Sequence, residues 1–148
     1  MAAFLEGKLP DDLPFDYQLA MDRLRDYRAP RDKLSHHRAS GEVLRIRKGL
    51  YVPGPNRRGE LAVEPLVLAG LVFGPSYVSL ETTLSWHGLI PERVEDIGSM
   101  TSKRAKTFRT PVGTFRYEPI PERAFAVGVK LESARGGSYF LAEPEKAL

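Results

Sequence analysis

The residues most able to do chemistry in this chain are its lysines and arginines, because they are concentrated in one stretch. Residues 28–58 contain nine basic residues and two acids, a net charge of +7 (nine minus two), although the whole chain of 148 residues carries only +3. Residues 60–148 carry −1 (10 basic minus 11 acidic). Such a local positive field usually faces phosphate or another polyanion, and the alternative is a solvated basic face without a partner.

Histidines and carboxylates do not form a comparable pattern. The chain has no cysteine, which excludes disulfides, Cys-ligated zinc and thiol catalysis. His36 and His37 are adjacent, so on a helix they point about 100° apart and cannot bind one metal ion, and His87 is expected to pack on an apolar stripe. No strand carries the acid–x–Lys pair of a metal nuclease, and Gly-x-Ser-x-Gly and phosphate-binding loops are absent from the sequence. We therefore expect no enzyme activity, metal or cofactor. The carboxylates considered are Glu60, Glu64, Glu81, Glu92, Glu95, Asp96 and Glu118.

Two helices are predicted before and within the basic stretch. Apolar residues at steps of three and four predict an amphipathic helix over residues 16–27, with Asp16 as its N-cap. Pro30 and Gly41 bracket a second, polar helix, which is expected to dock through Leu34 and Ala39. Its outward residues are then Arg31, Lys33, Ser35, His36 and Arg38.

A basic β-hairpin is predicted directly after this polar helix. In residues 42–47, Leu44 and Ile46 alternate with Arg45 and Arg47, which is the period of a half-buried strand. Lys48-Gly49 is a tight-turn signal, and residues 50–52 form the return strand.

A helix, a basic helix and a basic hairpin in this order predict a winged helix-turn-helix. A helix about 10–12 Å wide fits the DNA major groove, where donors can read base edges. We therefore expect Arg31, Lys33, Ser35, His36 and Arg38 to contact bases. Arg45, Arg47 and Lys48 would contact phosphates, which supply most of the affinity for DNA.

The second half of the chain predicts helices packed on an antiparallel sheet. Residues 53–60 are rich in proline and glycine and are the best linker candidate. A buried helix over 61–73 and a further helix over 76–88, with Ser79 as a possible cap, are expected to follow. The predicted strands cover 97–101, 107–110, 114–120, 126–131 and 139–141, and 143–148 is expected to begin another helix. The fold class is therefore α+β, with a winged-helix domain over 1–56 and an α+β domain over 57–148.

A second basic cluster lies in a predicted loop between two of these strands. It consists of Lys103, Arg104 and Lys106, and Arg109 follows it in the next predicted strand. It is either an ordinary solvated turn or a contact with a partner or with flanking DNA.

The remaining expectations concern localisation. No apolar run approaches the roughly 20 residues needed to cross a bilayer, and the N-terminus lacks the features of a signal peptide. We therefore expect a cytoplasmic protein that does not bind a membrane.

Several motifs resemble one family. Residues 45–51 (RIRKGLY) resemble the wing of the AbiEi-type antitoxin and transcriptional regulator family. Residues 75–92, which include PSYVSLE and SWHGLIPE, look like the most specific motif of that family. Residues 101–115 and 143–148 are similar to its next block and to the start of its next helix, so that the resemblance covers about residues 15–148 and indicates that the family continues beyond them.

This resemblance implies a function and two partners. The N-terminal domain would bind double-stranded DNA at its own promoter and repress it, and binding would occlude the promoter. The C-terminal domain would counteract a nucleotidyltransferase-like toxin encoded alongside, in a bacterial toxin–antitoxin or abortive-infection system. Two alternatives stay open, namely a toxin-neutralising interaction module whose winged helix is incidental and a nuclease-related, DNA-targeting protein.

Overall fold

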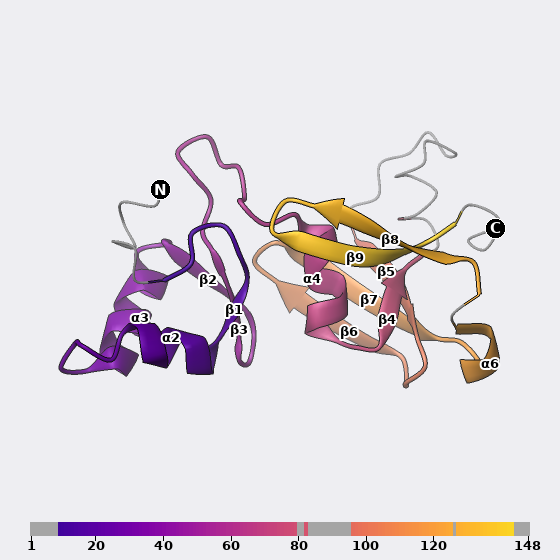
Figure 1. Cartoon of the computed structure of the whole chain (residues 1–148), viewed down its shortest axis with the longest axis horizontal. Helices are drawn as coiled ribbons and strands as arrows, with labels where there is room; N and C mark the ends of the chain where they lie inside the picture. Colours follow the sequence, from indigo (N-terminus) through magenta and orange to yellow (C-terminus); the bar gives the residue numbers. More distant parts are fainter. Residues whose placement is uncertain (1–8, 80–81, 83–95, 126, 144–148) are drawn as a thin grey trace.

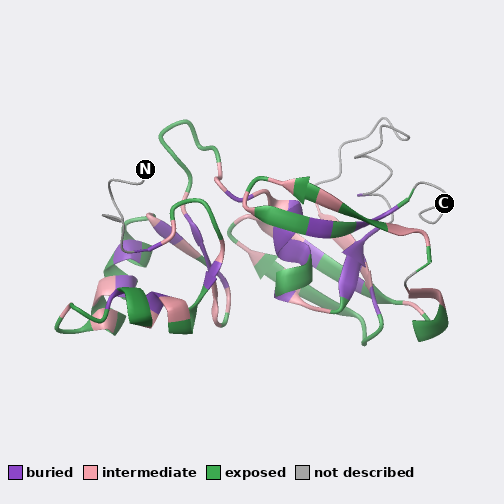
Figure 2. Ribbon diagram, viewed as in Figure 1, coloured by how far each residue is buried: buried purple, intermediate pink, exposed green. Residues whose placement is uncertain are grey.

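The chain folds into a mixed α+β structure made of two halves (Figure 1). The computed structural model describes residues 9–79, 82, 96–125 and 127–143, and within them it contains four helices and nine strands in two sheets. We call residues 9–53 the N-terminal half and residues 61–143 the C-terminal half. The exposed loop between them, the predicted linker, projects from the molecule (Figure 2). Among the described residues, no helix is long and apolar enough to cross a membrane.

The N-terminal half places two helices beside a three-stranded antiparallel sheet. Its elements are β1 (Phe15–Asp16), α2 (Tyr17–Arg23), α3 (Pro30–Ala39), β2 (Val43–Arg47) and β3 (Leu50–Pro53), and the strand order is β1-β3-β2. Strand β1 was not predicted. It pairs with β3, and the stacked rings of Phe15 and Tyr51 lie 5.8 Å apart at that pairing.

The first predicted helix is correct at its start and too long at its end. Asp16 is its N-cap, because the Oδ1 atom of Asp16 accepts a 2.7 Å hydrogen bond from the Leu19 backbone N–H. The helix ends at Arg23, and Tyr27 N–H already bonds the Leu24 carbonyl in a turn. The restriction that Pro30 places on the residue before it keeps Ala29 out of the helical conformation before α3 begins.

The second helix and the hairpin form where the sequence predicts them. Pro30 stands at the first position of α3, while Gly41 and Gly49 adopt φ values of +84° and +83°, the left-handed conformation that suits glycine after a helix and in a tight turn. One predicted anchor of α3 is wrong. Ala39 is exposed, and His37 is buried beside Leu34 instead.

The C-terminal half wraps a six-stranded sheet around one helix. The helices are α4 (Pro65–Val72) and α6 (Glu122–Phe125). The strands are β4 (Ser76–Val78), β5 (Ile97–Thr101), β6 (Lys106–Thr110), β7 (Gly113–Pro119), β8 (Val129–Ala134) and β9 (Gly137–Ala142). The strand order is β6-β7-β5-β4-β9-β8. Helix α4 packs against β4, β5, β7 and β9, so it lies within the curve of the sheet (Figure 1).

The prediction of a purely antiparallel sheet is wrong. Strand β7 runs parallel to β5, and β4 runs parallel to β9 where Val78 faces Leu141. Strand β6 lies at the edge of the sheet, and the chain reverses twice between β5 and β7. Two reversals restore the original direction, so β7 returns beside β5 in parallel.

The predicted helix over 76–88 is wrong at its start. Ser76–Val78 is a buried strand that pairs with β5, and the Ser79 N–H extends the pairing by bonding the Gly98 carbonyl at 2.9 Å. Thr82, within the predicted range, is helical, and the remaining residues of that prediction, 80–81 and 83–88 with His87, fall outside the described residues. The helix expected at 143–148 is also outside the described residues from residue 144 onward. The strand expected at 126–131 begins later, at Val129, after helix α6, which the sequence did not predict.

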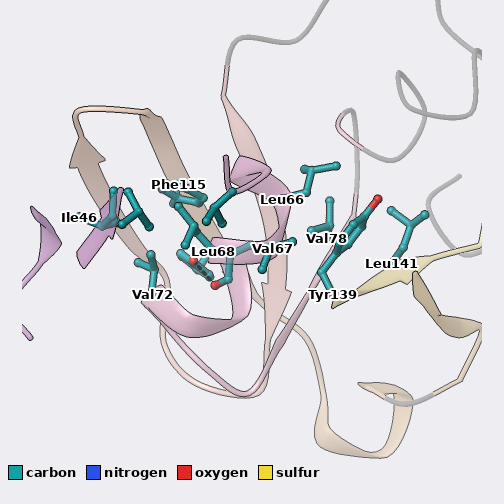
Figure 3. Close-up of a cluster of buried hydrophobic side chains, with 13 residues drawn as sticks. Ile46, Leu66, Val67, Leu68, Val72, Val78, Phe115, Tyr139 and Leu141 are labelled. Atoms are coloured by element: carbon teal, nitrogen blue, oxygen red, sulfur yellow. Dashed lines mark hydrogen bonds between the residues drawn. The ribbon is translucent and has the colours of Figure 1, made fainter. Parts of the chain in front are cut away.

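The hairpin β2–β3 contributes to the hydrophobic clusters of both halves. Val43 and Tyr51 are buried with α2 and α3, whereas Ile46 and Val52 are buried with α4 and the large sheet. Figure 3 shows Ile46 at one end of this second cluster, near Val72 and Phe115. The two halves therefore meet through a shared hairpin, and β2 lies beside the edge strand β6.

Candidate nucleic-acid interface

A polar network at the end of α3 fixes this helix to the hairpin. His37 Nδ1 lies 3.0 Å from Glu42 Oε1, and both side chains are largely buried. Ser40 Oγ lies 2.6 Å from the same carboxylate oxygen and 3.0 Å from the His37 carbonyl oxygen. The Ser40 hydroxyl, and after it His37, lowers the pKa of Glu42, and partial burial opposes the shift. Sequence reasoning missed this network, which compensates for the few apolar residues of α3.

With Leu34 and His37 facing the core, three of the predicted DNA-contacting residues share one side of α3. Arg31, Ser35 and Arg38 are spaced by four and three residues, and all three are exposed. Ser35 and Arg38 line a groove together with Arg45 of β2, and Pro111 of the β6–β7 turn also lines it. The structure therefore brings the helix and the hairpin together as one basic surface.

The other two predicted helix contacts lie apart from that side. Lys33 is half-buried on the opposite flank, with Nζ 4.7 Å from the ring centroid of Tyr27. His36 is exposed, and its ring centroid lies 6.3 Å from that of His37.

The three predicted hairpin contacts also separate into two groups. Arg45 and Lys48 are exposed, whereas Arg47 is half-buried and its Nη1 donates a 2.5 Å hydrogen bond to the Val72 carbonyl oxygen. The pairing of β2 with β3 shifts register between Arg45 and Arg47, so the alternation expected from the sequence is interrupted there. Arg47 therefore faces the C-terminal half.

Arg47 lies in a second cluster that the sequence did not predict as a unit. Its guanidinium carbon lies 4.9 Å from the ring centroid of Phe108, and Lys106 Nζ lies 5.3 Å from the same centroid. Lys103 Nζ lies 5.2 Å from the ring centroid of Phe73. We call these five residues the ring cluster. The hairpin and the predicted loop cluster thus meet across a sequence separation that no local pattern reveals.

The other two basic residues of that region, Arg104 and Arg109, lie in different places. Arg104 lines the hollow formed by Phe73, Lys103 and Lys106, and Arg109 is exposed further along β6. Burial raises the pKa of Tyr117, whose ring lies 5.2 Å from that of Phe73, and the positive charge of Arg47 opposes this shift.

Among the described residues, no carboxylate lines the groove or the hollow, but Asp32 is exposed on α3 next to Arg31. Glu64 pairs with Arg135 at 3.7 Å, Asp96 pairs with Arg116, and Glu60 accepts a hydrogen bond from Asn56. Glu118 is exposed, and Glu81, Glu92 and Glu95 fall outside the described residues. In the part of the chain that the structure describes, no ion pair involves Arg38, Arg45 or Lys48, and no group of three histidines or acids could hold a metal ion.

Comparison with protein-family models and with curated proteins gave no match.

Proposed function

We propose that the protein binds double-stranded DNA and regulates transcription, with the N-terminal half acting as a winged helix-turn-helix. The observation that carries this proposal is the groove in which Ser35 and Arg38 of α3 and Arg45 of β2 lie together. The strand order β1-β3-β2, with α2 and α3 between the first two strands in sequence, supports it. In this arrangement α3 is the recognition helix and β2–β3 is the wing.

The basic surface matches the two tasks of DNA recognition. Arg31, Ser35 and Arg38 project from one side of α3 as donors for base edges, and His36 lies on the neighbouring exposed side. Arg45 and Lys48 supply phosphate contacts beside the helix, where no carboxylate of the described residues neutralises them. Lys33 and Arg47 are not part of this surface, because Lys33 packs on the ring of Tyr27 and Arg47 binds the Val72 carbonyl oxygen.

That the protein acts on its own promoter is proposed from the resemblance to the AbiEi-type family. On that reading the protein is a bacterial antitoxin that represses its own promoter by occluding it. Its C-terminal half counteracts a nucleotidyltransferase-like toxin, through contact or indirectly. A reading frame of that type directly downstream would support this assignment.

The DNA-binding proposal is tested by measuring affinity at several salt concentrations for a duplex taken from the upstream region of the gene. Arg45→Ala/Lys48→Ala removes two phosphate contacts, so the slope of log affinity against log salt should flatten by about 1.8, or 0.9 for each contact. The matched control is Arg123→Ala/Lys130→Ala, which removes the same charge from exposed sites of α6 and β8 in the C-terminal half.

Comparison of the two variants shows whether DNA binding depends on where the positive charges lie or only on how many there are. The control should keep the slope of the unaltered protein. Equal flattening by both variants would show that only net charge matters, and no duplex binding at all would overturn the proposal in favour of a protein-interaction module. Metal-dependent cleavage of the duplex that survives purification would favour a nuclease.

A further inference from the structure

The ring cluster gathers positive charge from both halves of the molecule. Arg47 comes from β2, Lys103 from the segment between β5 and β6, and Lys106 from the start of β6. Lys106 lies 5.8 Å from the ring centroid of Phe73 as well as 5.3 Å from that of Phe108, so it bridges the two rings. The ring centroids are themselves 5.8 Å apart.

The attraction of the rings does not neutralise this charge. A cation over an aromatic face keeps its full charge, and at an exposed site the attraction between the two is weak. Lys103, Arg104 and Lys106 are exposed, and among the described residues none of them forms an ion pair. Arg47 uses one nitrogen for the Val72 carbonyl oxygen, and a guanidinium carries five donors. The cluster therefore keeps donors and charge for an anion.

Its hollow can admit such an anion. An open depression at the surface is lined by Phe73, which is half-buried, and by Lys103, Arg104, Ala105 and Lys106. Several cations around one concavity focus a positive potential there, which raises the local concentration of anions. The forked donors of arginine and the three donors of a lysine ammonium suit the oxygens of a phosphate.

We propose that the ring cluster, together with Arg104, is a phosphate-binding site at the junction of the two halves. The phosphate is carried either by the backbone of DNA that flanks the contacts of α3 or by a small phosphorylated compound. The first source rests on the proposed function. Arg47 does not line the hollow, but it shares the Phe108 ring with Lys106, so the hairpin lies beside the phosphate site.

The first experiment uses inorganic pyrophosphate and does not depend on DNA binding. We expect pyrophosphate to shift the backbone amide NMR signals of residues 101–107 in the full chain. Lys103→Ala/Lys106→Ala should weaken this binding about tenfold or more, the loss expected for a charge-assisted hydrogen bond. Lys103→Arg/Lys106→Arg should restore it, because the charge and the donors return. The matched control Arg123→Ala/Lys130→Ala should bind like the unaltered protein.

The second experiment distinguishes the two sources of phosphate. The salt dependence of binding is compared on a short upstream duplex and on one extended by roughly 10 base pairs, one helical turn, on each side. If flanking DNA supplies the phosphate, Lys103→Ala/Lys106→Ala flattens the slope by about 1.8 on the long duplex only. If the slope is unchanged on both while pyrophosphate binding is lost, the ligand is a small phosphorylated compound.

The outcomes also separate this proposal from the proposed function. Failure of the protein to bind any duplex would overturn DNA recognition, and the pyrophosphate titration would still test the phosphate site. The phosphate site is contradicted if Lys103→Ala/Lys106→Ala and the control behave alike toward pyrophosphate and toward both duplexes.

Discussion

Arg45 and Arg47 are two residues apart on one strand, yet they belong to surfaces of different kinds. Arg45 is exposed and shares a groove with Ser35 and Arg38, whereas Arg47 is half-buried against Val72 and Phe108. The first surface has its cations open to solvent, whereas in the second Arg47 is half-buried and Lys103 and Lys106 are exposed over aromatic rings at the junction of the two halves. The comparison shows that one short strand can place one arginine on an open basic surface and another in contact with the other half of the molecule.

The packing between the two halves should be weakened most by a substitution of Ile46, the hairpin residue that is buried with α4. Ile46→Ala should lower the free energy of unfolding by about 2–5 kcal/mol, because it leaves a cavity between the halves. Urea unfolding followed by circular dichroism measures the change. Leu13→Ala removes a comparable side chain that is exposed, and it should change stability little. Equal effects of the two variants would show that the hairpin is not part of the C-terminal core.

The two arginines themselves give the next largest contrast. Arg47→Ala should destabilise the protein by about 1–3 kcal/mol, because the Val72 carbonyl loses its donor and Phe108 loses a packing partner. Arg45→Ala should stay within about 0.5 kcal/mol of the unaltered protein, since its side chain is exposed. The same urea titrations compare them, and a larger loss at Arg45 would reverse the roles assigned here.

A substitution of Glu42, in the polar network at the end of α3, should have a smaller effect on stability, and this effect depends on pH. Glu42→Gln should cost about 1–2 kcal/mol near neutral pH, because a carboxylate binds Ser40 and His37 more strongly than an amide does. The pKa of Glu42 is lowered in the folded protein from its usual 4.5. The carboxylate therefore stabilises the fold above that value, and this contribution is lost as the pH falls through the lower, folded pKa.

The measurement is the difference in unfolding free energy between Glu42→Gln and the unaltered protein along a pH series. It should be constant above the usual pKa of glutamate and shrink toward zero in stronger acid. A difference that does not change with pH would contradict the role given to the charged carboxylate.

Local signals in the sequence were sufficient for most of the N-terminal half. Pro30, Gly41 and the Lys48-Gly49 turn mark boundaries through backbone geometry alone, and the structure has α3 and the hairpin at those boundaries. The burial of His37 could not be predicted in this way, because its partner Glu42 stabilises it only once the chain has turned at Gly41.

Long-range contacts explain what the sequence did not reveal. Ser76–Val78 reads as the start of a helix, and only its pairing with β5 and β9 makes it a central strand. The position of Arg47 depends on a register shift and on Phe108, which is far away in the sequence. The groove could be predicted in part, as Ser35, Arg38 and Arg45, because helix and hairpin are neighbours in the chain. The ring cluster could not.

The most direct test of the central claim, that α3 reads DNA bases, is the effect of Arg38→Ala on specificity. Affinity is measured at one salt concentration for the upstream duplex and for a scrambled duplex of equal length and composition. A base contact by arginine is worth about 1–3 kcal/mol, so Arg38→Ala should weaken binding to the upstream duplex by about 5–150-fold and to the scrambled duplex much less. Equal losses on both duplexes, or none, would contradict the assignment of α3 as the recognition helix.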